Sequence, residues 1–97
     1  MWTEKANKAI LIEIGARCKE YRIRKNLQQR ELAVNAGTSL DTISRFEKGG
    51  SISTLKLIAI LRALDMLENL EGLIPEPPIS PILLRKLQGV KKKRIRK

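Results

Sequence analysis

Two short apolar patterns on either side of Gly37 constrain the fold of this chain more than any other feature. The apolar residues of the first pattern are Leu32, Ala33 and Ala36, and those of the second are Leu40, Ile43 and Phe46. Both patterns have the spacing of one face of an α-helix. Gly37 directly follows the first pattern, at a position where helices commonly end in a left-handed glycine. Residues 28–49 therefore predict two short helices joined by a tight turn.

The ends of the second short helix are also marked in the sequence. Either Thr38 or Ser39 can act as its N-cap, because both carry a hydroxyl that can accept a hydrogen bond from the first helical turn. Gly49 and Gly50 follow the last apolar residue and are expected to end the helix. This helix is therefore expected to cover about residues 39–48.

Further helical segments flank this pair. Residues 9–25 predict a long helix with a buried stripe made of Ile10, Ile14, Cys18 and Tyr21. Residues 51–64 predict another helix with Ser53 as its N-cap, and residues 67–74 predict one or two further helical turns. The expected fold class is therefore all-α, a bundle of about five helices.

The charge of the chain indicates a polyanionic partner. The chain has 97 residues and a formal net charge of +10, which favours nucleic acid binding. Six basic residues lie in the last seven positions: Lys91, Lys92, Lys93, Arg94, Arg96 and Lys97. Without these six charges a net charge of +4 remains. This basic tail can serve as an arm on DNA, as a partner-binding segment or for solubility, and we favour the arm.

Several classes of function are disfavoured by composition. The chain has one cysteine, Cys18, and no histidine, which argues against an internal disulfide and against a metal site with the usual ligands. Without histidine or a glycine-rich phosphate loop, we expect neither an enzyme nor a cofactor. The N-terminus lacks a signal-peptide pattern, and no apolar run reaches about 18 residues. A cytoplasmic protein without a membrane partner is expected.

A specific set of residues points to a known family. These are Gln29, Glu31-Leu32-Ala33, Ala36-Gly37, Thr42-Ile43-Ser44-Arg45 and Glu47-Lys48-Gly49. Together with flanking matches over about residues 10–70, they resemble the helix-turn-helix regulators of the Xre/Cro type, the family of the lambdoid phage repressors. The resemblance implies a lambda-repressor-like bundle that binds double-stranded DNA, with the helix at 39–48 in the major groove.

The same resemblance implies a set of DNA contacts. The residues implied at base edges are Ser39, Leu40, Asp41 and Arg45, and those implied at phosphates are Gln29, Thr42 and Lys48. Arg45 suits a bidentate contact with guanine O6 and N7, and Asp41 can accept a hydrogen bond from cytosine N4. Asp41 departs from the glutamine common in phage relatives. Leu40 either contacts a thymine methyl group or packs inside.

Two further pairings follow from the family pattern. Arg22 and Glu47 match a pair that joins the first helix to the end of the recognition helix, and an ion pair between them is expected. The apolar residues Leu67, Leu70, Leu73 and Ile74 lie where relatives commonly form a dimer interface. The alternative for these four residues is simple packing over the core.

The chain is expected to divide into three parts. These are an N-terminal arm (1–8), a helix-turn-helix DNA-binding domain (9–74) and a C-terminal extension (75–97). The extension consists of a proline-rich linker, a short amphipathic segment at 82–87 and the basic tail.

The C-terminal extension is similar to the ends of small Xre-type regulators that are encoded with HipA-like toxin kinases. The resulting hypothesis is a HipB-like antitoxin that represses its own operon as a homodimer and binds a HipA-like kinase. Two alternatives stay open. One is a phage-type or restriction-controller repressor, and the other is a protein-interaction module that mainly inhibits a partner protein.

Overall fold

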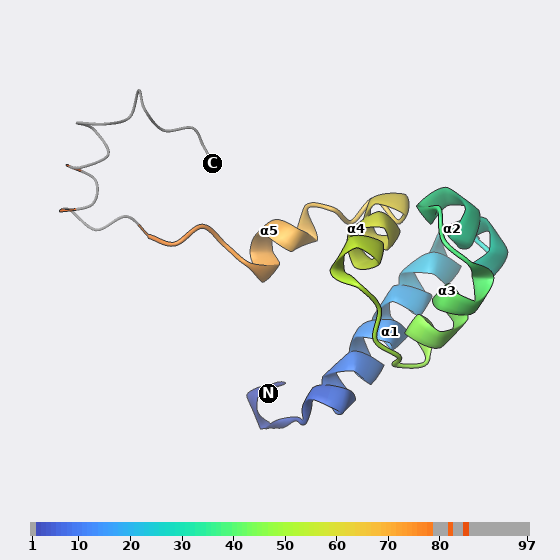
Figure 1. Ribbon diagram of the computed structural model, residues 1–97, viewed down its shortest axis with the longest axis horizontal. Helices are drawn as coiled ribbons and strands as arrows, with labels where there is room; N and C mark the ends of the chain where they lie inside the picture. The colour runs from blue at the N-terminus through green and yellow to red at the C-terminus, as the bar shows by residue number, and fades with distance from the viewer. Residues whose placement is uncertain (1, 79–81, 83–84, 86–97) are drawn as a thin grey trace.

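The protein is built from helices throughout the part of the chain that the computed structural model describes, residues 2–78, 82 and 85 (Figure 1). A 3-10 turn, η1 (Trp2–Glu4), precedes five α-helices: α1 (Asn7–Arg24), α2 (Gln29–Ala36), α3 (Leu40–Glu47), α4 (Thr54–Ala63) and α5 (Asn69–Leu73). This confirms the all-α prediction for the described residues. None of these helices is both long and apolar enough to cross a membrane.

The turn between α2 and α3 has the geometry that its sequence predicts. Gly37 adopts a left-handed conformation, with a φ of 67°, and ends α2. The backbone N–H of Thr38 donates to the carbonyl oxygen of Ala33 at 2.9 Å. Ser39 is the N-cap of α3, since its Oγ accepts a hydrogen bond from the backbone N–H of Thr42 at 3.1 Å. Of the two candidate caps, Ser39 is therefore the one used.

The core lies where α2 packs on α3 and α4 and where α3 packs on α1. Its buried apolar residues are Cys18, Leu32, Ala33, Ile43, Phe46, Ile60, Leu61 and Leu64. Ser53 caps α4 through a hydrogen bond from the backbone N–H of Lys56, as predicted. At the crossing of α1 and α3, Gly15 lies so close to Phe46 that a Cβ atom would overlap its carbonyl oxygen. This contact brings α3 directly against the first helix.

One predicted core position is wrong. Tyr21 was expected in the buried stripe of the first helix, but it is 45% exposed. It lines an open, mainly apolar groove of about 280 Å³ together with Trp2, Leu57 and Leu73. The tyrosine therefore lies beside the core and not in it. The Trp2 ring folds back onto α1, with its centroid 4.8 Å from the guanidinium carbon of Arg17.

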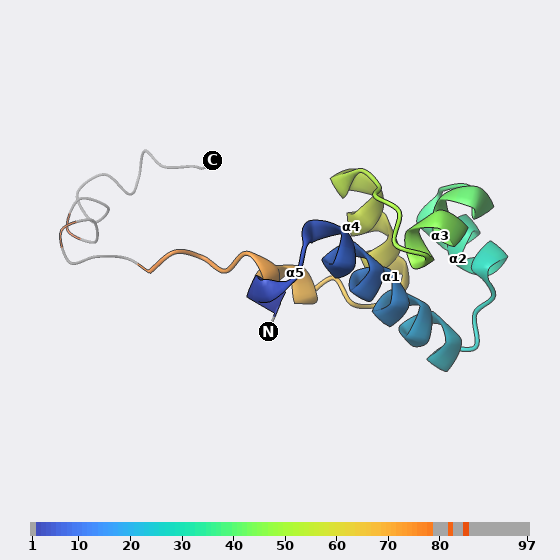
Figure 2. The same cartoon turned by 90° about the horizontal axis from the view of Figure 1, so that it is seen from below.

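Within the described residues, one short helix follows the core. The helical turns predicted at 67–74 form α5, which covers only Asn69–Leu73. Residues 74–78, which follow α5, lead away from the other helices in two perpendicular views (Figures 1 and 2). The basic tail at 91–97 and most of the amphipathic segment at 82–87 lie outside the described residues.

Candidate nucleic-acid interface

The helix α3 presents one polar, exposed face. Ile43, Phe46 and Glu47 turn inward and are buried. Asp41, Arg45 and Lys48 are exposed, and their i, i+4, i+7 spacing places them along a single face. An α-helix with its side chains is about 10–12 Å wide, which matches a major groove about 12 Å wide. The exposed face of α3 therefore has the shape of a groove-reading surface.

Two of the predicted base-contacting residues form an ion pair with each other. Arg45 Nε lies 3.4 Å from Asp41 Oδ2, and both side chains are about three-quarters exposed, at 74% and 75%. The contact uses Nε and so leaves the terminal nitrogens of the guanidinium available. Those nitrogens supply the donors for a bidentate contact with guanine. Leu40, the third predicted residue, is 40% exposed, so part of its side chain is accessible.

The hydroxyls of Ser39 and Thr42 are tied to each other at 2.9 Å. One of the two O–H groups donates across this contact, while Ser39 Oγ also accepts from the backbone N–H of Thr42. One O–H donor of the two remains for an outside partner. The predicted base contact at Ser39 and the predicted phosphate contact at Thr42 therefore share a single free donor.

A buried network anchors the far end of α3. Arg22 Nε donates to Glu47 Oε2 at 2.7 Å, and Arg22 Nη2 donates to Glu47 Oε1 at 3.1 Å. The exposed fractions of these side chains are 9% and 3%. Arg22 Nη1 also donates to the carbonyl oxygen of Leu27 at 2.7 Å. The structure thus brings together the two residues of the predicted ion pair, and a bidentate contact of this kind fixes orientation as well as distance.

Gln29 belongs to the same network. Its Nε2 donates to Glu47 Oε1 at 2.9 Å, which leaves one amide N–H and the amide oxygen of Gln29 unused by this contact. Gln29 is also the first residue of α2, whose first-turn N–H groups favour an anion. The family resemblance predicted a phosphate contact for Gln29, but it did not indicate that the carboxylate of Glu47 holds the Gln29 side chain.

A residue missed by the sequence reasoning is Lys56. It lines a polar pocket of about 240 Å³ between α3 and α4, which is shared with Thr42, Arg45, Ser51 and Ser53. Lys56 lies in the first turn of α4, directly behind the Ser53 cap. The sequence signal that could have indicated Lys56 is its position three residues after the N-cap serine of a helix. This pocket extends the polar surface of α3 onto the start of α4.

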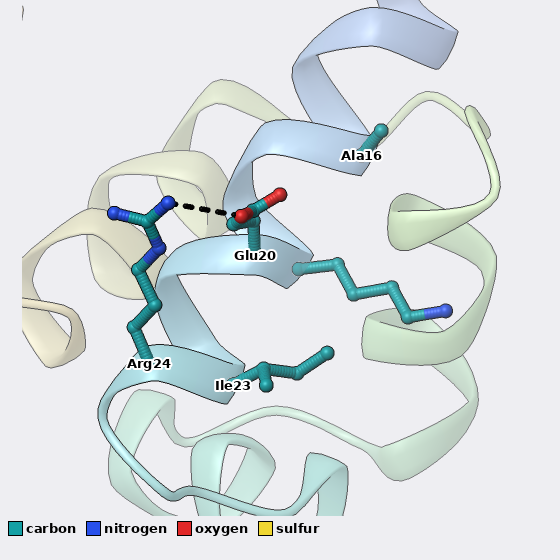
Figure 3. Close-up of a pocket in the computed structure, with 5 residues that line it drawn as sticks. Ala16, Glu20, Ile23 and Arg24 are labelled. Atoms are coloured by element: carbon teal, nitrogen blue, oxygen red, sulfur yellow. Dashed lines mark hydrogen bonds and ion pairs between the residues drawn. The ribbon is translucent and has the colours of Figure 1, made fainter.

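A second depression lies on α1 alone (Figure 3). It has a volume of about 310 Å³ and is lined by Ala16, Lys19, Glu20, Ile23 and Arg24. The ion pair between Arg24 Nη2 and Glu20 Oε2, at 3.1 Å, spans one turn of the helix. Because all of its lining residues belong to one helix, this depression does not bring groups from different elements together.

The four predicted dimer residues differ in exposure. Leu67 and Leu70 are half-buried, whereas Leu73 and Ile74 are 63% and 79% exposed. Exposed apolar residues at the end of a small helical bundle leave room for a partner surface.

Comparison with protein families identifies a match. A model of a helix-turn-helix family matches residues 19–68, which include α2, α3 and α4 and make up just over half of the chain. No curated protein matches the chain. The matched segment contains the capped turn, the exposed face of α3 and the buried pair that anchors it. The chain belongs to the helix-turn-helix family, in its Xre/lambda-repressor-like class of DNA-binding domains.

Proposed function

We propose that this protein is a sequence-specific DNA-binding transcriptional repressor that acts as a homodimer. The observation that carries the proposal is the exposed face of α3, with Asp41, Arg45 and Lys48 in one row and with Ile43 and Phe46 fixed in the core behind them. Since the matched family is one of DNA-binding regulators, this face is the part of the molecule suited to base edges.

In this proposal each exposed residue has a defined role. Arg45 donates its terminal nitrogens to guanine O6 and N7, and Asp41 accepts from cytosine N4. Ser39 and Leu40 lie at the start of α3, where base edges are within reach of a recognition helix. Phosphates are contacted by Gln29, Thr42 and Lys48, and we add Lys56 at the start of α4.

The homodimer is proposed through Leu67, Leu70, Leu73 and Ile74. A two-fold dimer places two copies of α3 on one face of the DNA, with half-sites about 10 bp apart. Bound near a promoter, such a dimer represses transcription by occluding it. The moderate number of buried apolar side chains in a chain of this length also favours stabilisation by a partner subunit.

The operon context is a narrower part of the proposal. The C-terminal extension supports a HipB-like antitoxin that represses its own operon and binds a HipA-like toxin kinase. Co-expression of the chain with the neighbouring gene product, followed by co-purification, tests this directly. A phage-type or restriction-controller repressor would bind its operator equally well without such a complex. A protein-interaction module would form a complex but bind DNA weakly.

The DNA-binding assignment is tested by alanine substitution with a matched control. After an operator has been selected from a random duplex pool, affinity is measured on that operator and on its single-base variants. Arg45→Ala is expected to cost about 1–3 kcal/mol and to relax preference at one base pair. Arg24→Ala is the control, because Arg24 is equally exposed and also forms an i, i+4 ion pair, but lies on α1.

Gln29→Ala gives the complementary result. A phosphate contact carries no base identity, so this variant is expected to weaken all operator variants by about the same factor. If Arg45→Ala instead behaved like Arg24→Ala, with unchanged affinity and site preference, the assignment of α3 as the reading helix would be wrong.

A further inference from the structure

A shallow groove between α4 and α5 has an apolar floor. Ile58, Leu67, Leu70 and Ile74 line it, and its volume is about 570 Å³. Ile58 and Ile74 are 36% and 79% exposed, so this floor is accessible in the isolated chain. Covering these apolar side chains removes their surface from water, which gives the groove the capacity to bind another apolar segment.

The rim of this groove is acidic. Glu68, Glu71 and Glu76 line it, with Arg62 as a single basic residue among its lining residues. Within the described part of the chain, none of these three carboxylates forms an ion pair. An apolar floor beneath unpaired carboxylates suits a segment that is both apolar and basic.

The C-terminal end of this chain has that composition. Residues 79–97 carry eight Lys and Arg residues and no Asp or Glu. Four apolar residues are clustered there: Ile82, Leu83, Leu84 and Leu87. Arg85 and Lys86 lie directly among them. Ile82 is 70% exposed, and Arg85 is exposed as well. The segment at 82–87 therefore complements the groove in both apolar content and charge.

The direction of the chain favours a second copy over the chain's own groove. Pro75, Pro77 and Pro78 hold the backbone extended, and each proline disfavours a helical conformation in the residue before it. In both views residues 74–78 lead away from the helical body (Figures 1 and 2). To reach its own groove, the segment at 82–87 would have to reverse within about three residues after Pro78.

We propose that the groove between α4 and α5 binds the segment at 82–87 of a second copy of this chain. Leu83, Leu84 and Leu87 of one subunit cover the apolar floor of the other, and Arg85 and Lys86 pair with its acidic rim. In a two-fold dimer the segment at 82–87 of each subunit, from here on called the arm, binds in the groove of the other subunit. The proposal rests on the homodimer proposed above and names what fills the apolar surface of α5.

Cross-linking between two differently tagged chains tests the arm exchange. One chain carries Glu71→Cys on the groove rim, and the other carries Arg85→Cys in the arm. The native Cys18 is buried and can remain. After co-expression, a short bis-maleimide is expected to give a covalent heterodimer, because only a contact between subunits can join the two cysteines. The matched control replaces Glu71→Cys by Glu20→Cys, an exposed position on α1 outside the groove.

A cross-linked heterodimer that exceeds the control supports the proposal. A heterodimer yield no higher than the control overturns it. So does an internally linked monomer from a chain that carries both Glu71→Cys and Arg85→Cys. Sedimentation of the same samples distinguishes failure of the arm exchange from failure of the homodimer. If the protein sediments as a dimer but gives no cross-link, the homodimer proposal stands and the arm-exchange proposal is wrong.

Affinity measurements give an independent readout. Glu71→Lys and Arg85→Glu are each expected to raise the dimer dissociation constant by up to about fivefold, the effect of an exposed ion pair. Leu84→Glu is expected to raise it by about tenfold or more. Combining Glu71→Lys with Arg85→Glu is expected to restore most of the loss. Additive losses in the combined variant would count against the contact.

Discussion

The carboxylate of Glu47 offers the sharpest test of how this fold is held together. It accepts three hydrogen bonds, at 2.7 Å and 3.1 Å from Arg22 and at 2.9 Å from Gln29. In Glu47→Ala the guanidinium of Arg22, which is 9% exposed as a side chain, keeps its hydrogen bond to Leu27 but loses its counter-charge. Breaking one partner of a buried pair costs about 3–5 kcal/mol.

That loss is large for a domain of this size. A helical domain of roughly 70 residues is stable by about 3.5–10 kcal/mol, so Glu47→Ala removes a large part of the total. Each kcal/mol shifts the melting temperature of such a domain by about 4–8 °C, which predicts a fall of at least about 12 °C. Urea unfolding followed by circular dichroism measures the free energy directly.

The matched variant replaces both partners. Arg22→Met combined with Glu47→Leu leaves no buried charge, and replacements of this kind are commonly neutral or stabilising. The control is the ion pair of Glu20 and Arg24, which joins the same residue types but is exposed to water. Glu20→Ala is expected to lower the free energy of unfolding by less than about 1 kcal/mol. A cost below about 1 kcal/mol for Glu47→Ala would refute the account of a desolvated, mutually dependent pair.

Three further predictions concern other parts of the molecule. Gly15→Ala is expected to destabilise by about 1–3 kcal/mol or more, because a Cβ overlaps the carbonyl oxygen of Phe46, whereas Gly72→Ala meets nothing within 4 Å and serves as the control. Burial raises the pKa of the Cys18 thiol, so its contribution to stability is complete below the unfolded pKa of about 8.5 and is lost as pH rises through the folded pKa. The difference in unfolding free energy between wild type and Cys18→Ala should therefore shrink above about pH 8.5, and a constant difference would contradict this. If the basic tail is a DNA arm, deletion of Lys91–Lys97 should flatten the slope of log K against log salt by about 0.9 for each lost phosphate contact, whereas identical slopes would leave partner binding or solubility.

Local signals in the sequence predicted the helix-turn-helix geometry well. Gly37, Ser39 and Ser53 act through their own backbone or through a partner within three residues, so their types are sufficient to place a turn or a cap. The apolar spacing of α3 likewise predicted Ile43 and Phe46 in the core. These features depend on neighbours along the chain and can therefore be inferred from one sequence.

Features that depend on distant parts of the chain were less predictable. Tyr21 continues the apolar stripe of α1, but its burial depends on what packs beside the helix, and there the structure has an open groove. The hydrogen bond between Gln29 and Glu47 joins residues 18 positions apart. Lys56 and Arg45 line the same pocket because of the positions that α3 and α4 take in the fold. The apolar periodicity of a sequence does not indicate which residues of different helices come into contact.

The network around Glu47 also explains why a charged pair is useful here. An apolar pair at 22 and 47 could anchor α3 equally well, but it would not hold the amide of Gln29, which donates to Glu47. The carboxylate thus couples the orientation of α3 to the side chain at the start of α2. If Arg22→Met with Glu47→Leu kept full stability, its DNA affinity should fall evenly across operator variants, as for Gln29→Ala. A variant with unchanged stability and weaker DNA binding would indicate that Arg22 and Glu47 serve to position Gln29 for its phosphate contact.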